Sequence, residues 1–132
     1  LLYYGLSVGG TCLVGLVCFY LWPTAVPAFE RLPGSGLAML EGIDAAGNAC
    51  PSLHVAIAVF SAIWLHHQLR AVAAGRAWLA LNWLWCLLIA YSTLATKQHV
   101  VLDVLGGVLL GALGGLLTLG LFRRRFAADA KV

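Results

Sequence analysis

Residues 100–122 read VVLDVLGGVLLGALGGLLTLGLF, an apolar run in which Asp103 is the only charged side chain. A helix that crosses the hydrocarbon core of a bilayer needs about 20 mostly apolar residues, and this run is long enough. Within it, Gly107, Gly111 and Gly115 recur at every fourth position. Small residues at this spacing let two helix backbones approach closely inside a membrane. The stretch therefore predicts a membrane-spanning helix packed tightly against a neighbour.

The same criterion of length and composition selects three further stretches: residues 1–22, 52–69 and 77–96. Residues 52–69 are the weakest candidate, because the stretch is short and ends close to His66 and His67. Of the 132 residues, 62% are hydrophobic and only 10% are charged. Soluble domains carry about 25% charged residues. We therefore expect residues 1–132 to form a single all-α domain, an integral membrane bundle with four transmembrane helices.

Arginines predict how this bundle is oriented. Arg70 and Arg76 flank the short loop between the second and third stretches, and residues 123–125 are all arginine. Short loops rich in Lys and Arg remain on the cytoplasmic side of a membrane. Four spans with both termini in the cytoplasm place all of these arginines on the cytoplasmic side, and residues 23–51 then form an outer loop. The net charge of +3 thus reflects membrane orientation, and it does not indicate nucleic-acid binding.

Two histidines and one carboxylate lie where predicted spans begin. His54 follows Pro51 and Ser52 at the start of the second span, and His99 and Asp103 open the fourth. His99 and Asp103 are four residues apart, so their side chains share one face of a helix. The predicted topology brings the starts of the second and fourth spans to the same membrane face. We therefore expect all three side chains to converge in one pocket at the non-cytoplasmic surface.

This set of residues suits phosphate ester chemistry. Titratable side chains are costly within lipid, and those present there are functional candidates. The Asp103 carboxylate can accept the N–H of His99, which leaves the other ring nitrogen free as a nucleophile or base. The helix start at Ser52 offers backbone N–H groups to an anion, and Lys97 adds a cation. Donors of this kind stabilise charge on phosphoryl oxygens.

Two segments carry a resemblance to a known family. PSLH at residues 51–54, followed by STLATKQHVVLD at residues 92–103, resembles the signature of the type 2 phosphatidic acid phosphatase superfamily. The family pattern is Pro-Ser-Gly-His, then Ser-Arg, five residues, His, three residues and Asp. Leu53 in the first motif and PTAVP at residues 23–27 look closer to the inositol phosphorylceramide synthase-like branch of inositolphosphotransferases. The resemblance covers about residues 20–120.

The resemblance implies a membrane phosphatase or phosphotransferase that cleaves the phosphate ester of a lipid through a phosphohistidine. In this reading His99 is the catalytic nucleophile, Asp103 orients it, and His54 protonates the leaving oxygen. His54 then activates either water or an acceptor hydroxyl group. The resemblance implies no metal and no other cofactor. The usual family core has six spans, and since the chain begins without Met, we expect its four spans to be part of such a core.

Two departures from the family pattern concern the binding of phosphate. Thr93 stands where the family has a phosphate-binding Arg, and the family's Lys-(six residues)-Arg-Pro motif is absent. Lys97 is the obvious replacement cation, although a lysine there can also extend to the membrane interface. Arg31 is a further candidate. We expect Ser52, Lys97 and Arg31 to bind the substrate.

Two alternatives to this function stay open. Two histidines and a carboxylate also form a common metal-ligand set, which would make the protein a metal-dependent membrane hydrolase. A non-enzymatic helix bundle, such as a transporter or assembly subunit, would place further charges at mid-depth, and none occurs in the four stretches. The expected partners are a phosphorylated lipid substrate and the surrounding membrane lipids. The pattern does not decide between water and a hydroxyl group as the acceptor.

Overall fold

The computed structural model describes residues 1–24, 49–96 and 99–129, and the side chains of these segments up to residue 125. The described residues form four α-helices: α1 (Leu2–Leu21), α3 (Leu53–Ala71), α4 (Arg76–Ala95) and α5 (Val101–Asp129). The described segments contain no β-strand, so the predicted all-α fold is confirmed. The helix bounds lie within two residues of the predicted spans except at the C-terminal end of α5, which continues to Asp129.

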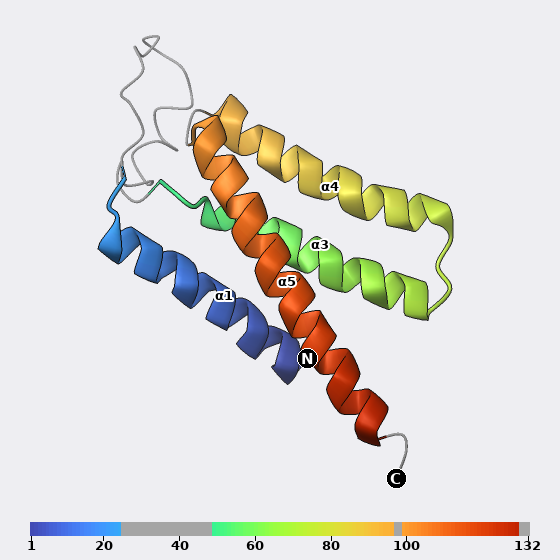
Figure 1. The fold of residues 1–132 in the computed structure, drawn as a ribbon. Helices are drawn as coiled ribbons and strands as arrows, with labels where there is room; N and C mark the ends of the chain where they lie inside the picture. The colour runs from blue at the N-terminus through green and yellow to red at the C-terminus, as the bar shows by residue number, and fades with distance from the viewer. Residues whose placement is uncertain (25–48, 97–98, 130–132) are drawn as a thin grey trace.

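Helix α3 is the centre of the bundle (Figure 1). It contacts α1, α4 and α5, and its longest contact is with α5, which crosses it diagonally. Helix α4 is joined to α3 by a short turn and packs antiparallel to it, while α1 packs against both α5 and α3. The starts of α3 and α5 consequently lie at the same end of the bundle.

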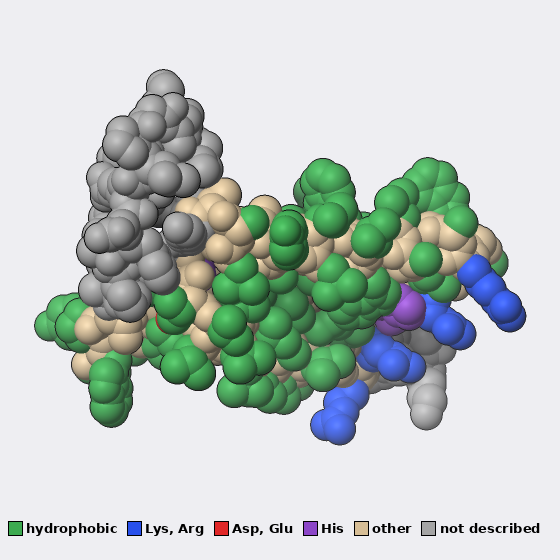
Figure 2. Space-filling model, turned by 90° about the horizontal axis from the view of Figure 1, so that it is seen from above, with side chains coloured by type: hydrophobic (Ala, Val, Ile, Leu, Met, Phe, Trp, Pro, Cys, Tyr) green, Lys and Arg blue, Asp and Glu red, His purple; other side chains and the backbone are tan. Residues whose placement is uncertain are grey.

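Three of the described helices are long and apolar enough to cross a membrane: α1, α4 and residues Val101–Arg125 of α5. Their outer faces leave large apolar side chains such as Leu13, Trp85 and Leu109 exposed, and apolar side chains cover much of the face in Figure 2. A helix bundle within a membrane exposes apolar surface on this scale, because its outer side chains contact lipid tails and not water.

Helix α3 differs from the prediction that residues 52–69 are an apolar span. It is a helix of 19 residues, but it is not among the helices apolar enough to cross a membrane. The physical reason is a set of polar residues near its two ends and at its middle: His54, Ser61, His66, His67, Gln68 and Arg70. Several of its apolar residues pack against the neighbouring helices, and Val55, Ala56 and Phe60 are 0% exposed.

The glycine row of α5 provides the close contact with α3. A Cβ atom at Gly107 would lie 2.5 Å from the Ser52 carbonyl oxygen, and one at Gly111 would lie 3.0 Å from Ala56 Cα. A Cβ at Gly115 would lie 3.1 Å from Ile63 Cδ1. The predicted close packing of this row is therefore confirmed.

An aromatic cluster holds α1, α3 and α5 together farther along the bundle. Trp64 of α3 lies against Tyr3 and Tyr4 of α1 and against Phe122 of α5, with ring centroids 5.3 to 5.9 Å apart. The indole N–H of Trp64 donates to Thr118 Oγ1 at 3.3 Å, so its polar atom is satisfied within the bundle. Tilted and edge-on aromatic pairs of this kind add about 0.5–1.5 kcal/mol each beyond the burial of their area.

Replacing Gly111 with Ala should destabilise the bundle. The new methyl group would meet the backbone of Ala56, and overpacking of this kind costs about 1–3 kcal/mol. The matched control is Gly120→Ala on the same helix, because nothing lies within 4 Å of a Cβ there. The measurement is the midpoint of unfolding of each variant in detergent micelles. Equal midpoints for the two variants would contradict the importance of the α3–α5 contact.

Candidate functional site

His99 and Asp103 form a pair at the start of α5. His99 precedes the helix, and Asp103 lies in its first turn. His99 Nδ1 is 3.6 Å from Asp103 Oδ2, and the two side chains are 10% and 6% exposed. The same carboxylate oxygen accepts the backbone N–H of Val100 at 3.0 Å, as in a helix cap. The carboxylate is thereby fixed at the helix start with one oxygen facing the imidazole.

The distance between His99 Nδ1 and Asp103 Oδ2 is slightly longer than a hydrogen bond. His99 Nδ1 is buried and has no hydrogen-bond partner among the described residues. A buried polar atom without a partner is costly, so a small movement of the ring toward Asp103 would be favourable. Catalytic hydrogen bonds are often long before the substrate binds and shorten in the complex.

His54 approaches this pair from another helix. It is the second residue of α3 and is exposed, and its ring centroid lies 6.2 Å from that of His99 with an angle of 60° between the planes. The two imidazoles are close enough to contact one small ligand group from two directions. The structure thus brings together the three side chains His54, His99 and Asp103.

Backbone contacts between α3 and α5 hold the site together. The N–H of Ser52 donates to the carbonyl oxygen of Asp103 at 2.9 Å. A Cβ atom at Gly106 would lie 3.3 Å from both Cys50 Sγ and Pro51 Cβ, so the chain before α3 lies directly against α5. On the other side, the N–H of His99 donates to the carbonyl oxygen of Thr93 at 3.3 Å. These contacts fix the relative positions of His54 and His99.

Ser52 lies deeper than a substrate-binding residue is expected to lie. It is 0% exposed, and its hydroxyl oxygen caps α3 by accepting the N–H of Val55 at 3.5 Å. The close approach of Gly107 to the Ser52 carbonyl explains this burial. In this structure Ser52 holds the helix start beneath His54.

The predicted phosphate-binding cations, Lys97 and Arg31, lie outside the described residues. Thr93, which replaces the family arginine, is 3% exposed, and its hydroxyl group donates to the carbonyl oxygen of Ala90 at 2.8 Å. It therefore packs into the bundle and does not reach toward His54. Every arginine that the structure describes lies at the other ends of the helices.

Cys50 is a neighbour of the pair that the sequence pattern does not single out. Its N–H donates to Thr24 Oγ1 at 2.8 Å, which ties it to the end of α1. Burial raises the pKa of the Cys50 thiol, and the nearby Asp103 carboxylate raises this pKa further. The thiol thus lies beside the carboxylate that faces His99. In the sequence, the only sign that Cys50 lies near the site is its position immediately before Pro51.

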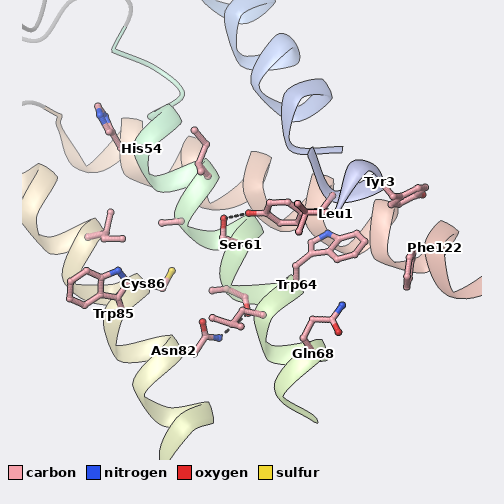
Figure 3. Close-up of a pocket in the computed structure, with 16 residues that line it drawn as sticks. Leu1, Tyr3, His54, Ser61, Trp64, Gln68, Asn82, Trp85, Cys86 and Phe122 are labelled. Carbon is pink, nitrogen blue, oxygen red and sulfur yellow. Dashed lines mark hydrogen bonds between the residues drawn. The ribbon is translucent and has the colours of Figure 1, made fainter. Parts of the chain in front are cut away.

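An apolar groove extends from His54 along α3 (Figure 3). It has a volume of about 830 Å³ and lies between α1, α3 and α4. His54 is at one end, and Gln68 and Phe122 are toward the other. Between these ends, Ile57, Ala58, Trp85 and Ile89 supply apolar walls.

The polar groups within this groove are largely paired with each other. The Tyr4 hydroxyl and Ser61 Oγ are 2.8 Å apart, and the Asn82 amide donates to the Ala62 carbonyl oxygen at 2.9 Å. Since these groups already have partners, the walls of the groove favour a hydrocarbon ligand over a polar one. Among the described residues, no three His, Cys, Asp or Glu side chains form a group that could hold a metal ion.

Alkylation of Cys50 tests the geometry of this site without any substrate. In a protein whose other three cysteines are alanine, the raised pKa should make Cys50 react slowly with iodoacetamide near pH 8, because little thiolate is present. Asp103→Asn removes the negative charge, lowers this pKa, and should speed alkylation severalfold at the same pH. The measurement is the alkylation rate against pH. His66→Gln, at the other end of α3, should leave the profile unchanged, and an unchanged profile in Asp103→Asn would contradict the contact.

Comparison with known proteins agrees with the geometry. The PAP2 superfamily model matches residues 1–127, nearly the whole chain. No curated protein and no solved structure matches the chain. A membrane helical fold is typical of this family, and membership indicates a phosphatase-type activity. With its helical bundle and a match over residues 1–127, the chain belongs to the PAP2 superfamily.

Proposed function

We propose that the protein cleaves the phosphate ester of a membrane lipid through a covalent phosphohistidine on His99. One observation carries this proposal: His99 Nδ1 faces Asp103 Oδ2 at 3.6 Å while His54 approaches the same ring from another helix. This is the arrangement of a nucleophile, a residue that orients it, and a separate acid–base group. Membership of the PAP2 superfamily supports the same reaction class.

The first half-reaction uses the free nitrogen of His99. When the Nδ1–H of His99 donates a hydrogen bond to the Asp103 carboxylate, Nε2 keeps its lone pair and can attack phosphorus. The N–P bond forms as the P–O bond to the leaving group breaks, and the leaving oxygen takes a proton from His54. Asp103 stabilises the positive charge that develops on the His99 ring, which lowers the barrier.

The second half-reaction restores the enzyme. His54, now neutral, takes a proton from water or from an acceptor hydroxyl group, whose oxygen bonds to phosphorus as the N–P bond breaks. Water as acceptor makes the protein a phosphatase, and a hydroxyl group makes it a phosphotransferase. The Leu53 variant of the motif and residues 23–27 favour transfer, as in the inositol phosphorylceramide synthase-like branch.

The groove beside His54 supports a lipid as the substrate. From His54 to Gln68 the axis of α3 rises about 21 Å, which is comparable to the length of a long acyl chain. A ligand with its phosphate at His99 would therefore place its hydrocarbon tail along Ile57 and Ile89. We place the phosphate end at the non-cytoplasmic face, because the described arginines lie at the opposite ends of the helices.

Three groups remain for binding the phosphate. The start of α3 presents the positive end of its helix dipole near His54. Lys97 lies two residues before His99, and Arg31 lies in the predicted outer loop that leads to Pro51. We assign the binding of phosphate to Lys97, in place of the arginine that the family has at the position of Thr93.

His99→Ala should lower turnover of a lipid phosphate by at least about a thousandfold and abolish labelling, because no nucleophile remains. The measurement is release of radiolabelled phosphate, together with trapping of acid-labile, base-stable labelled protein. His66→Ala is the matched control on α3 and should retain nearly full activity. Loss of activity on chelation with recovery on adding zinc would instead support a metal-dependent hydrolase. No turnover of any lipid phosphate by the wild type would support a non-enzymatic bundle.

The loss of rate caused by His54→Ala should depend on the leaving group of the substrate. Loss of a general acid costs about 10²–10⁴-fold for an alkyl phosphate, whose leaving oxygen needs a proton. An aryl phosphate such as p-nitrophenyl phosphate leaves without protonation, so the same variant should form the labelled intermediate at nearly the wild-type rate. Single-turnover labelling with both substrates makes this comparison. Equal losses for the two substrates would show that His54 is not the acid of the first step.

A further inference from the structure

Five arginines gather at the end of the bundle opposite His54 and His99. Arg70 lies in the last turn of α3, Arg76 is the first residue of α4, and residues 123–125 lie near the end of α5. All five side chains are exposed. In Figure 2 the Lys and Arg side chains, in blue, lie together at one end of the molecule, with a histidine beside them.

The described part of the protein does not neutralise this charge. The structure describes one carboxylate side chain, that of Asp103, and it lies at the start of α5, far from Arg123 along the same helix. From residue 103 to residue 123 a helix rises about 30 Å, several times the screening length at physiological salt. The five guanidinium groups are therefore available to anions from outside the described bundle.

Aromatic side chains place this end at the level of lipid headgroups. Trp78 is 61% exposed two residues after Arg76. The Trp83 indole N–H donates to His66 Nδ1 at 3.1 Å, and Phe122 directly precedes the last three arginines. Trp side chains concentrate at the boundary between hydrocarbon and headgroups in membrane proteins. The arginines thus lie at the depth where lipid phosphates occur.

We propose that this surface, Arg70, Arg76 and Arg123 to Arg125, binds the headgroups of anionic phospholipids. A guanidinium group matches a phosphate with two parallel hydrogen bonds, and an exposed group on a helix end can adapt to a mobile lipid. Each basic residue near an anionic bilayer surface increases association about fivefold. The proposal is independent of the function assigned to His99, because none of these five side chains reaches that site.

Tryptophan fluorescence can report this binding directly. The protein, with Trp22, Trp64 and Trp85 replaced by Phe so that Trp78 and Trp83 are the remaining tryptophans, is placed in lipid nanodiscs that have the same composition in both leaflets. Increasing fractions of dibrominated phosphatidylglycerol or dibrominated phosphatidylcholine then quench Trp78 and Trp83. The proposal predicts that phosphatidylglycerol quenches at a severalfold lower mole fraction, and that 0.5 M salt reduces this preference. Equal quenching by the two lipids in the wild type would overturn the proposal.

Charge-neutral variants identify the residues responsible. Arg70→Gln with Arg76→Gln, and separately Gln at residues 123–125, should each reduce the preference for phosphatidylglycerol at least about fivefold. The matched lysine variants keep the charge and should retain most of the preference. If the arginines serve only to orient the chain, the glutamine variants will keep the wild-type preference in these symmetric bilayers. Should a triple variant fail to fold, the single Arg76→Gln variant gives the same comparison.

Discussion

The contact between α3 and α5 determines where the histidines meet. Because Gly107 has no side chain, the backbone of α5 can approach the Ser52 carbonyl, and the Ser52 N–H can donate to the Asp103 carbonyl at 2.9 Å. This hydrogen bond joins the starts of two helices that are separated by the whole of α4 in the sequence. The 6.2 Å separation of the two imidazole centroids follows from that junction. A bulkier residue at 107 would separate the helix starts and, with them, the two rings.

The central place of α3 explains how a polar helix can belong to this bundle. Polar side chains within lipid are costly unless they find partners, and neighbouring helices provide them here. Ser61 pairs with Tyr4 of α1, and the α3 backbone at Ala62 accepts a bond from Asn82 of α4. His54 lies near one end of α3 and Arg70 near the other, where headgroups and water are accessible. The enclosure of α3 therefore compensates for its low hydropathy.

Much of this architecture could be predicted from single features of the sequence. Apolar length located the helices, and the spacing of Gly107 and Gly111 indicated a close helix contact. The four-residue spacing of His99 and Asp103 predicted that their side chains are neighbours, although His99 precedes α5 and does not share a helix face with Asp103. Features that depend on how helices rotate against one another could not be read this way. The burial of Ser52, for example, arises from the approach of α5, and a sequence pattern contains no information about that rotation.

The distribution of charge divides the bundle into two ends with different chemistry. The described arginines cannot help bind a phosphate at His99, because Arg70 is about 24 Å from His54 along the axis of α3. Thr93 contributes a buried hydroxyl group already bonded to Ala90, so it does not supply the charge of the family arginine. A phosphate bound at His99 would then rely on the dipole of α3 and on cations outside the described segments.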